Sequence, residues 1–246
     1  MPNFYFVDTN LLIGGCIPFD YLHDACVSFF EEKEKRRTFL LFSVEAEFFK
    51  KIQAEMISFS SMVGPALRDT IVDLSRLIKR KERLPHHEEL NFLKYIFHLC
   101  KTNEIKELSH ASLIEIKMAY FRTLKEDFDV LTHNWIKHPH MIGHPTLLND
   151  KIYRTHYLRL KKEIHEVDTR HLALAALEVE KRNRKHKGHH YFFYTNDKEW
   201  IEKDLESKIN IPNLKIKRIK YEDKLGYNPE TGSFNLKKIH YVSDGL

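Results

Sequence analysis

Cysteine is scarce in this chain of 246 residues, and its few copies are not arranged as a site. Only Cys16, Cys26 and Cys100 occur, and no two of them form a C-x-x-C pair. Disulfide frameworks use cysteines in pairs, and thiolate zinc sites use closely spaced ones, so the pattern favours neither. Thiols without partners suit a reducing compartment, and we therefore expect a cytoplasmic protein.

Glycine, proline and long apolar runs are also lacking. The chain has eight glycines and eight prolines, which leaves few places for a flexible linker. No run of about 18 apolar residues occurs, and Asp8 stands where a signal peptide would be apolar, so we expect no membrane partner. Because 42% of the residues are apolar and 30% are charged, we expect a single globular domain over residues 1–246.

Positive charge is in modest excess but gathers in clusters. The formal net charge is +5. Basic residues gather in KEKRR (33–37), KRKER (79–83), KRNRKHK (181–187) and KIKRIK (215–220). Such clusters can bind the phosphates of a nucleic acid, although any one of them can also be a solvated helix end.

Short apolar stretches alternate with one-sided helices at both ends of the chain, which predicts an α/β fold. FYFV (4–7) and TFLLFS (38–43) have the character of buried strands, and each leads into a helical pattern. After residue 168 a helix leads into the strand HHYFFYT (189–195), and one more helix and strand follow. This order favours a central parallel sheet with right-handed crossovers.

The middle and the end of the chain have a different pattern. Residues 60–165 show only the 3.6-residue period, including a predicted helix over 65–84, so we predict an inserted all-helical region. Residues 221–246 contain the turn-forming segment NPETGS, which predicts a C-terminal hairpin or tail.

Four acidic residues fall where the predicted sheet presents its carboxyl edge. Asp8 and Asp197 follow two strands that would be parallel, and Glu47 lies in the first turns after the second strand. Asp168 begins a helix that leads into a strand, and such a helix starts at the same edge. Each acid alone could be a helix cap, a turn residue or an i,i+4 partner. Together they predict one acidic cleft.

Carboxylates that crowd into one cleft need a cation between them. A set of oxygen ligands without cysteine selects a hard ion such as Mg²⁺ or Mn²⁺. Such an ion activates water and stabilises displacement at phosphorus. We therefore interpret the four acids as the catalytic residues of a phosphodiesterase.

The residues around these acids resemble the PIN-domain nuclease family. FVDTNLLI (6–13) is similar to the opening motif, DTRHLALAALE (168–178) to the helix of the third acid, and YFFYTNDKEW (191–200) to the closing motif. The resemblance implies a three-layer α/β/α PIN-like fold with its core in about 3–58 and 166–220. It also implies a metal-dependent nuclease that acts on RNA rather than DNA, in other words a ribonuclease.

The resemblance implies roles for individual residues. Asp8, Asp168 and Asp197 would hold the metal, and Glu47 would be a further ligand or would orient the attacking water. Glu47 is preferred over Glu45, because the family's second acid lies inside the helix and Glu45 is only two residues past Ser43, a predicted N-cap.

We also predict residues that would contact the substrate. The polar side chains beside the acids, which would bind or position groups there, are Thr9, Asn10 and Thr195. The side chains that would meet the phosphate backbone are Arg182, Arg184, Lys185 and Lys187. A homodimer and an inhibitor protein are further partners that the resemblance raises.

Other interpretations stay open. A PIN-like chain can bind nucleic acid or protein without cutting, although here a candidate is present for every acid. Haloacid-dehalogenase-like phosphatases need a second Asp two residues after the first, where this chain has Asn10. No glycine-rich phosphate loop follows the first strand, which argues against a dinucleotide or P-loop site.

Overall fold

A computed structural model describes most of the chain. The described residues are 2–18, 20, 22–33, 37–67, 72–73, 91–102, 104–105, 107–136, 148–185, 188–219, 227–228 and 233–234. Most of the predicted helix 65–84 and Lys187 lie outside these ranges.

A four-stranded parallel sheet confirms the α/β prediction. The strand order is β2-β1-β5-β6, and every neighbouring pair is parallel. The strands are β1 (Asn3–Val7), β2 (Thr38–Phe39), β5 (His190–Thr195) and β6 (Leu214–Arg218). Because β1 lies between β2 and β5, the first strand of the chain is buried in the middle of the sheet.

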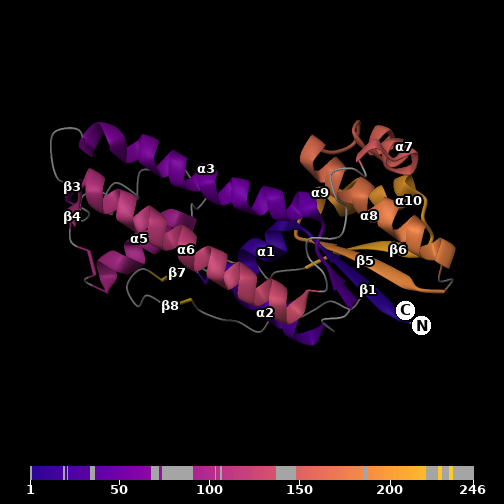
Figure 1. Cartoon of the computed structure of the whole chain (residues 1–246), viewed down its shortest axis with the longest axis horizontal. Coiled ribbons are helices and arrows are strands. Elements are labelled where there is room, and N and C mark those ends of the chain that lie inside the picture. Colours follow the sequence, from indigo (N-terminus) through magenta and orange to yellow (C-terminus); the bar gives the residue numbers. More distant parts are fainter. Residues whose placement is uncertain are drawn as a thin grey trace.

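Helices make up most of the remaining described structure. They are α1 (Thr9–Cys16), α2 (His23–Glu32), α3 (Phe42–Leu67), α5 (Asn91–Lys101), α6 (His110–Trp135), α7 (Lys151–Leu160), α8 (Glu166–Lys185), α9 (Lys198–Glu202) and α10 (Leu205–Ile209). In Figure 1, α7, α8 and α10 lie beside the sheet, whereas α3, α5 and α6 extend toward the opposite end. None of the helices in the described ranges has the length and apolar character that a membrane span requires.

Aromatic side chains fill both faces of the sheet. On one face Phe6 and Phe193 are fully buried, with ring centroids 6.4 Å apart. Arg182 of α8 stacks over Phe39 on this face, with its guanidinium carbon 4.3 Å from the ring centroid. On the other face Tyr194 contacts Phe29 of α2 at 4.7 Å between centroids. The period of two along β1 and β5 thus sends alternate residues to helices on opposite sides.

The structure corrects several details of the sequence prediction. The inserted region is not all helical, because β3 (Val72–Asp73) pairs with β4 (Glu107–Leu108). A two-residue ladder is too short to leave a period-two pattern in the sequence. The helix α1 was not predicted, since it has only eight residues and two of them are glycine.

Further corrections concern the ends of elements. The second strand ends at Phe39, and α3 already begins at Phe42. The N-cap of α7 is Asp150, because its carboxylate accepts the N–H of Ile152. The predicted helix 198–208 is divided into α9 and α10 at Asp204, which has a positive φ of 47°. In the C-terminal segment, β7 (Tyr227–Asn228) and β8 (Ser233–Phe234) form the predicted antiparallel pair.

Two glycines let α1 pack closely against its neighbours. A Cβ atom on Gly14 would lie 2.5 Å from Cys26 Sγ of α2. A Cβ atom on Gly15 would lie 2.5 Å from Leu131 of α6. The helix that leaves the end of β1 therefore has a fixed position against two other helices.

We expect Gly14→Ala to lower the free energy of unfolding by about 1–3 kcal/mol, because an added methyl group overpacks this contact. Cys26→Ala in the same chain should recover part of the loss, since it removes the atom that the new Cβ meets. Urea denaturation of both single variants and the double variant measures this coupling. Strictly additive effects would show that the glycine does not serve this close approach.

A partly buried acid on α3 helps to join α5 to the rest of the molecule. Glu55 Oε2 accepts the backbone N–H of Phe92 at 3.2 Å, in the first turn of α5. Burial, with a smaller contribution from the charge of Asp20, raises the pKa of Glu55 to about 7. Asp20 in turn accepts a hydrogen bond from Asn91 Nδ2 at 3.0 Å.

The raised pKa of Glu55 predicts a pH-dependent stability. The folded state binds the proton more tightly than the unfolded state, so stability falls as pH rises from about 4.5 to above about 7. Glu55→Gln keeps an acceptor oxygen without the charge, and we expect it to be more stable than the parent above pH 8 by up to about 3 kcal/mol. Near pH 4.5 the two proteins should be almost equal. Thermal denaturation across this pH range measures the difference, and Glu126→Gln at an exposed site is the control. If the two variants showed the same pH dependence, the assignment to Glu55 would be wrong.

Candidate metal centre

Asp8 reaches the carboxyl edge of the sheet directly after β1. The register pairs Val7 with Tyr194, so the next residues, Asp8 and Thr195, are neighbours. Thr195 Oγ1 donates to Asp8 Oδ2 at 2.7 Å. The N–H of Thr9 donates to Asp8 Oδ1, also at 2.7 Å, so Asp8 is the N-cap of α1. Asp8 is thus a helix cap that also lies at the edge where the other acids were predicted.

The Asp8 carboxylate is buried as well as bonded. Its residue is only 3% exposed, and burial raises its pKa above the ordinary value. His171, the Thr195 hydroxyl and Lys51 oppose this rise. A buried carboxylate is costly unless positive charge or donors surround it, so this position favours a cation nearby.

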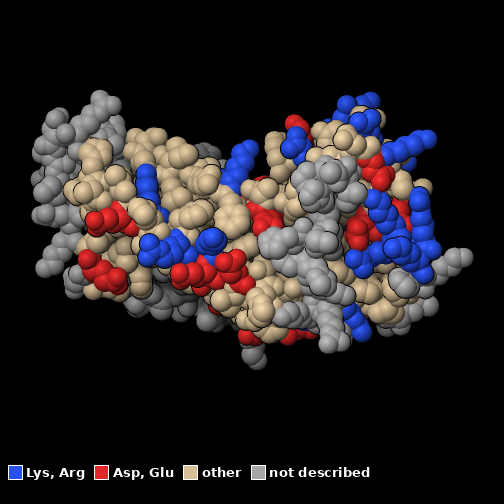
Figure 2. Space-filling model, in the orientation of Figure 1, with Lys and Arg blue, Asp and Glu red and all other residues tan. Residues whose placement is uncertain are grey.

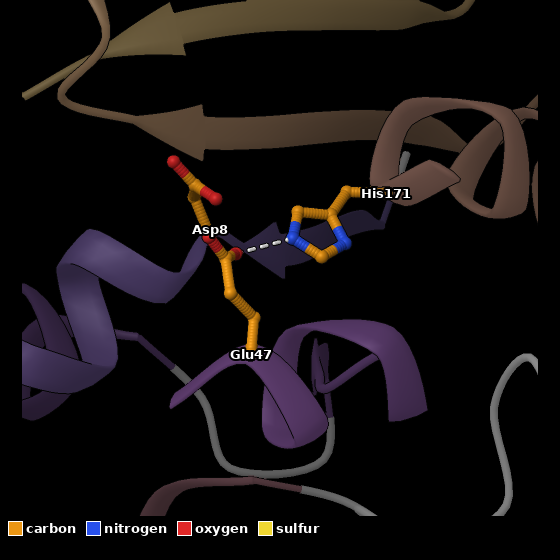
Figure 3. A group of neighbouring side chains, drawn as sticks. All are labelled: Asp8, Glu47 and His171. Carbon is orange, nitrogen blue, oxygen red and sulfur yellow. Dashed lines mark hydrogen bonds and ion pairs between the residues drawn. The ribbon is translucent and has the colours of Figure 1, made fainter. Parts of the chain in front are cut away.

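Glu47 approaches the same edge from α3. Its Oε2 accepts hydrogen bonds from the Thr9 hydroxyl and from His171 Nε2, the latter at 2.6 Å (Figure 3). Its Oε1 pairs with Lys51 Nζ at 3.0 Å. Burial would raise the pKa of Glu47, but these hydrogen bonds and the charge of Lys51 outweigh it and lower the pKa to about 2. Glu47 is therefore an anion across the physiological range.

A fully buried histidine joins α8 to α3. His171 Nδ1 lies 2.7 Å from Ser43 Oγ, and its Nε2 points at Glu47 (Figure 3). Because a carboxylate only accepts, Nε2 carries the proton, and in the neutral ring Nδ1 accepts from the Ser43 hydroxyl. Both nitrogens are thus engaged, and the ring fixes the orientation of Glu47.

Asp8, Glu47 and His171 form a compact group of potential ligands. Each offers an atom within 4.8 Å of the atoms of the other two. The carboxylates of Asp8 and Glu47 can turn an oxygen toward an ion. The imidazole of His171 could bind an ion only after breaking its hydrogen bond to Glu47 or to Ser43. We therefore regard it as a positioning group in this arrangement.

Asp168 and Asp197 lie outside that compact group but face it. Asp168 is in the first turn of α8, and its carboxylate has no hydrogen-bond partner among the described residues. Burial and then the negative charges of Asp8, Glu47 and Asp197 raise its pKa to about 6. Asp197 caps α9 by accepting the N–H of Glu199 at 2.8 Å. The four predicted acids thus share one electrostatic neighbourhood.

The polar residues predicted beside the acids are mostly buried. Thr9 is 1% exposed and Thr195 is fully buried, so both hold carboxylates in place and neither offers surface to a substrate. Thr195 Oγ1 also accepts the N–H of Asp197 at 2.9 Å, which links two of the acids. Asn10 is partly exposed, and its Nδ2 lies 3.5 Å from Asp8 Oδ2.

The basic cluster of α8 is not brought to the acids. At a rise of about 1.5 Å per residue, Arg182 lies roughly 21 Å along the helix from Asp168, and Lys185 lies farther still. Arg182 is engaged with Glu178 at 2.7 Å as well as with Phe39. Arg184 and Lys185 are exposed at this end of α8, and Lys187 lies outside the described residues. These cations can meet a nucleic acid only at a distance from the acidic cleft.

The sequence interpretation did not foresee the contact between Ser43 and His171. Ser43 was expected to be an N-cap, but it lies inside the first turn of α3 and contacts His171. Ser43, Glu47 and Lys51 are spaced by four residues, and this spacing places all three on one face of α3. That periodicity was a usable signal for the polar face that meets the cleft. It also agrees with the preference for Glu47 over Glu45.

Comparisons with known proteins find no relative of this chain. The sequence matches no protein-family model, and searches among curated proteins and among solved structures find no significant match.

Thr195→Val tests the buried link between β5 and Asp8. The substitution keeps the side-chain shape but leaves Asp8 Oδ2 and the Asp197 N–H without this partner. We expect a loss of about 1–3 kcal/mol in the free energy of unfolding, because unsatisfied buried polar groups cost this much. Thr123→Val, at an exposed position of α6, is the matched control and should change stability by less than about 0.5 kcal/mol. If both variants lowered the free energy of unfolding by the same amount in urea denaturation, Thr195 would not serve as the link between β5 and Asp8.

Proposed function

We propose that this protein is a divalent-metal-dependent nuclease that hydrolyses phosphodiester bonds, with RNA as its substrate. The proposal includes a three-layer α/β/α PIN-like fold, of which the four-stranded parallel sheet is the described centre. RNA rather than DNA follows from the resemblance of the motifs around the acids to that family.

The observation that carries the proposal is the crowding of acids with few cations among them. Asp168 has no bonded partner in the described ranges, and burial together with the neighbouring negative charges raises its pKa to about 6. Asp8 is buried with a raised pKa. Lys51 is already paired with Glu47 and cannot neutralise all of them. A bound divalent ion would relieve this repulsion, and oxygen donors without thiolates fit Mg²⁺ or Mn²⁺.

The roles of the individual residues follow from their contacts. Asp8, Asp168 and Asp197 would hold the ion, which when bound supplies charge stabilisation and an activated water. Glu47, kept ionised and oriented by His171 and Lys51, would complete the ligand set or align the water. Thr9 and Thr195 hold two of these carboxylates in place.

Removing two acids provides the test. Asn accepts hydrogen bonds as an N-cap almost as well as Asp, so Asp8→Asn/Asp197→Asn should leave α1 and α9 capped and the fold intact. We expect Mn²⁺ binding, measured by calorimetry, to weaken at least about tenfold. Cleavage of a labelled single-stranded RNA should fall at least about 100-fold.

The control is Glu126→Gln/Asp129→Asn, which makes the same change in net charge at exposed positions of α6. It should bind Mn²⁺ and cleave as the parent does. Circular dichroism of all three proteins establishes that they are folded. A folded Asp8→Asn/Asp197→Asn protein that still cuts at the parental rate would refute the proposal. Nucleic-acid binding without cleavage by the parent would favour a catalytically silent binding module, and preferential cutting of labelled DNA would correct the substrate.

A further inference from the structure

A groove between α3 and α6 lies apart from the acidic cleft and takes no part in the proposed nuclease function. It has a volume of about 590 Å³. Its apolar walls come from Met56 and Ile57 on α3 and from Met118 and Phe121 on α6. None of the residues that line it, all within the described part of the chain, is acidic.

The apolar side chains of this groove are unusually exposed. Ile57 is 64% exposed and Met118 is 59% exposed. Ile114, one helical turn before Met118, is 58% exposed. Two of the six large apolar side chains that are exposed within the described ranges therefore line the groove, and a third lies one helical turn away; such a cluster marks a binding surface more often than scattered single residues do. Methionine adapts its shape to a partner more readily than branched side chains do.

Cations border the apolar floor. Lys117, Arg122 and Lys125 of α6 line the groove, and none of the three pairs with an acid in the described ranges. By contrast, Lys198, Lys203 and Lys208 are each paired with a glutamate. In Figure 2, blue side chains lie on a largely tan surface in the left half of the view, with red side chains beside them. The groove therefore presents apolar surface together with cations that form no ion pair within the described ranges.

We propose that this groove binds an amphipathic α-helix of a partner protein, with acidic residues on both sides of the helix's apolar stripe. Exposed Ile57, Ile114 and Met118 need apolar side chains to cover them, which a phosphate backbone does not supply. Acidic residues beside the stripe match Lys117, Arg122 and Lys125. From Lys117 to Lys125 the groove runs about 12 Å along α6, which accommodates roughly two turns of a partner helix.

The probe is a pair of fluorescent, lactam-stapled helical peptides of about 18 residues, each with leucine at i, i+4, i+7 and i+11. One peptide carries glutamate beside the stripe, and the other carries lysine at the same positions. Fluorescence polarisation with the full-length protein should show at least about tenfold tighter binding of the glutamate peptide, and the preference should shrink as salt rises.

Three variants locate the binding. Met118→Glu should weaken binding of the glutamate peptide at least about tenfold. Lys117→Glu/Lys125→Glu should make the protein bind the lysine peptide more tightly than the glutamate peptide. Leu158→Glu changes a comparably exposed apolar residue on α7 and should have no effect. Circular dichroism checks the folding of each variant.

Several results would overturn the inference. These are absence of binding by either peptide, equal binding of the two, and binding that Met118→Glu leaves unchanged. A dimer detected by sedimentation and lost on Met118→Glu would assign the groove to a second copy of the chain. Single-stranded RNA binding that is lost on Lys117→Glu/Lys125→Glu, with no binding of the glutamate peptide, would assign it to nucleic acid.

Discussion

The in-register parallel pairing of β1 with β5 is the constraint on which the rest of the site depends. It joins residues from the two ends of the chain, and it makes Asp8 and Thr195 neighbours at the point where both strands stop. Asp197 and Glu47 are positioned relative to this pair. Thr195 also binds the backbone of Asp197, and Thr9, which follows Asp8, binds Glu47. Backbone hydrogen bonds of the sheet thus set positions that side chains alone could not hold.

Three of the four predicted acids lie at the N-termini of helices. Asp8 and Asp197 cap α1 and α9, and Asp168 lies in the first turn of α8. A helix N-terminus stabilises negative charge, so these positions reduce the cost of gathering carboxylates. The reduction is incomplete, since the pKa values of Asp8 and Asp168 remain raised. Natural proteins accept such local destabilisation where a site requires it.

Much of this arrangement could be predicted from the sequence, and the failures have physical causes. The strands at Asn3–Val7 and His190–Thr195 and the long helix α8 were evident, because buried apolar runs and a 3.6-residue period are strong signals. The helix α1 and the β3–β4 ladder were not, since short elements are determined by tertiary packing rather than by their own residues. The joint role of Ser43 and His171 depends on α3 meeting α8, and no local pattern reports a contact between residues so far apart.

The central position of β1 has a consequence for how this protein is made. Its partner β2 (Thr38–Phe39) follows closely, but its other partner, β5 (His190–Thr195), is synthesised much later. A growing polypeptide therefore carries β1 with one edge open, and Asp8 has neither Thr195 nor Asp168 nearby. Non-local pairing of this kind forms late and leaves an exposed strand edge in the meantime. The acids at this edge of the sheet thus come together only after β5 has been synthesised and has paired with β1.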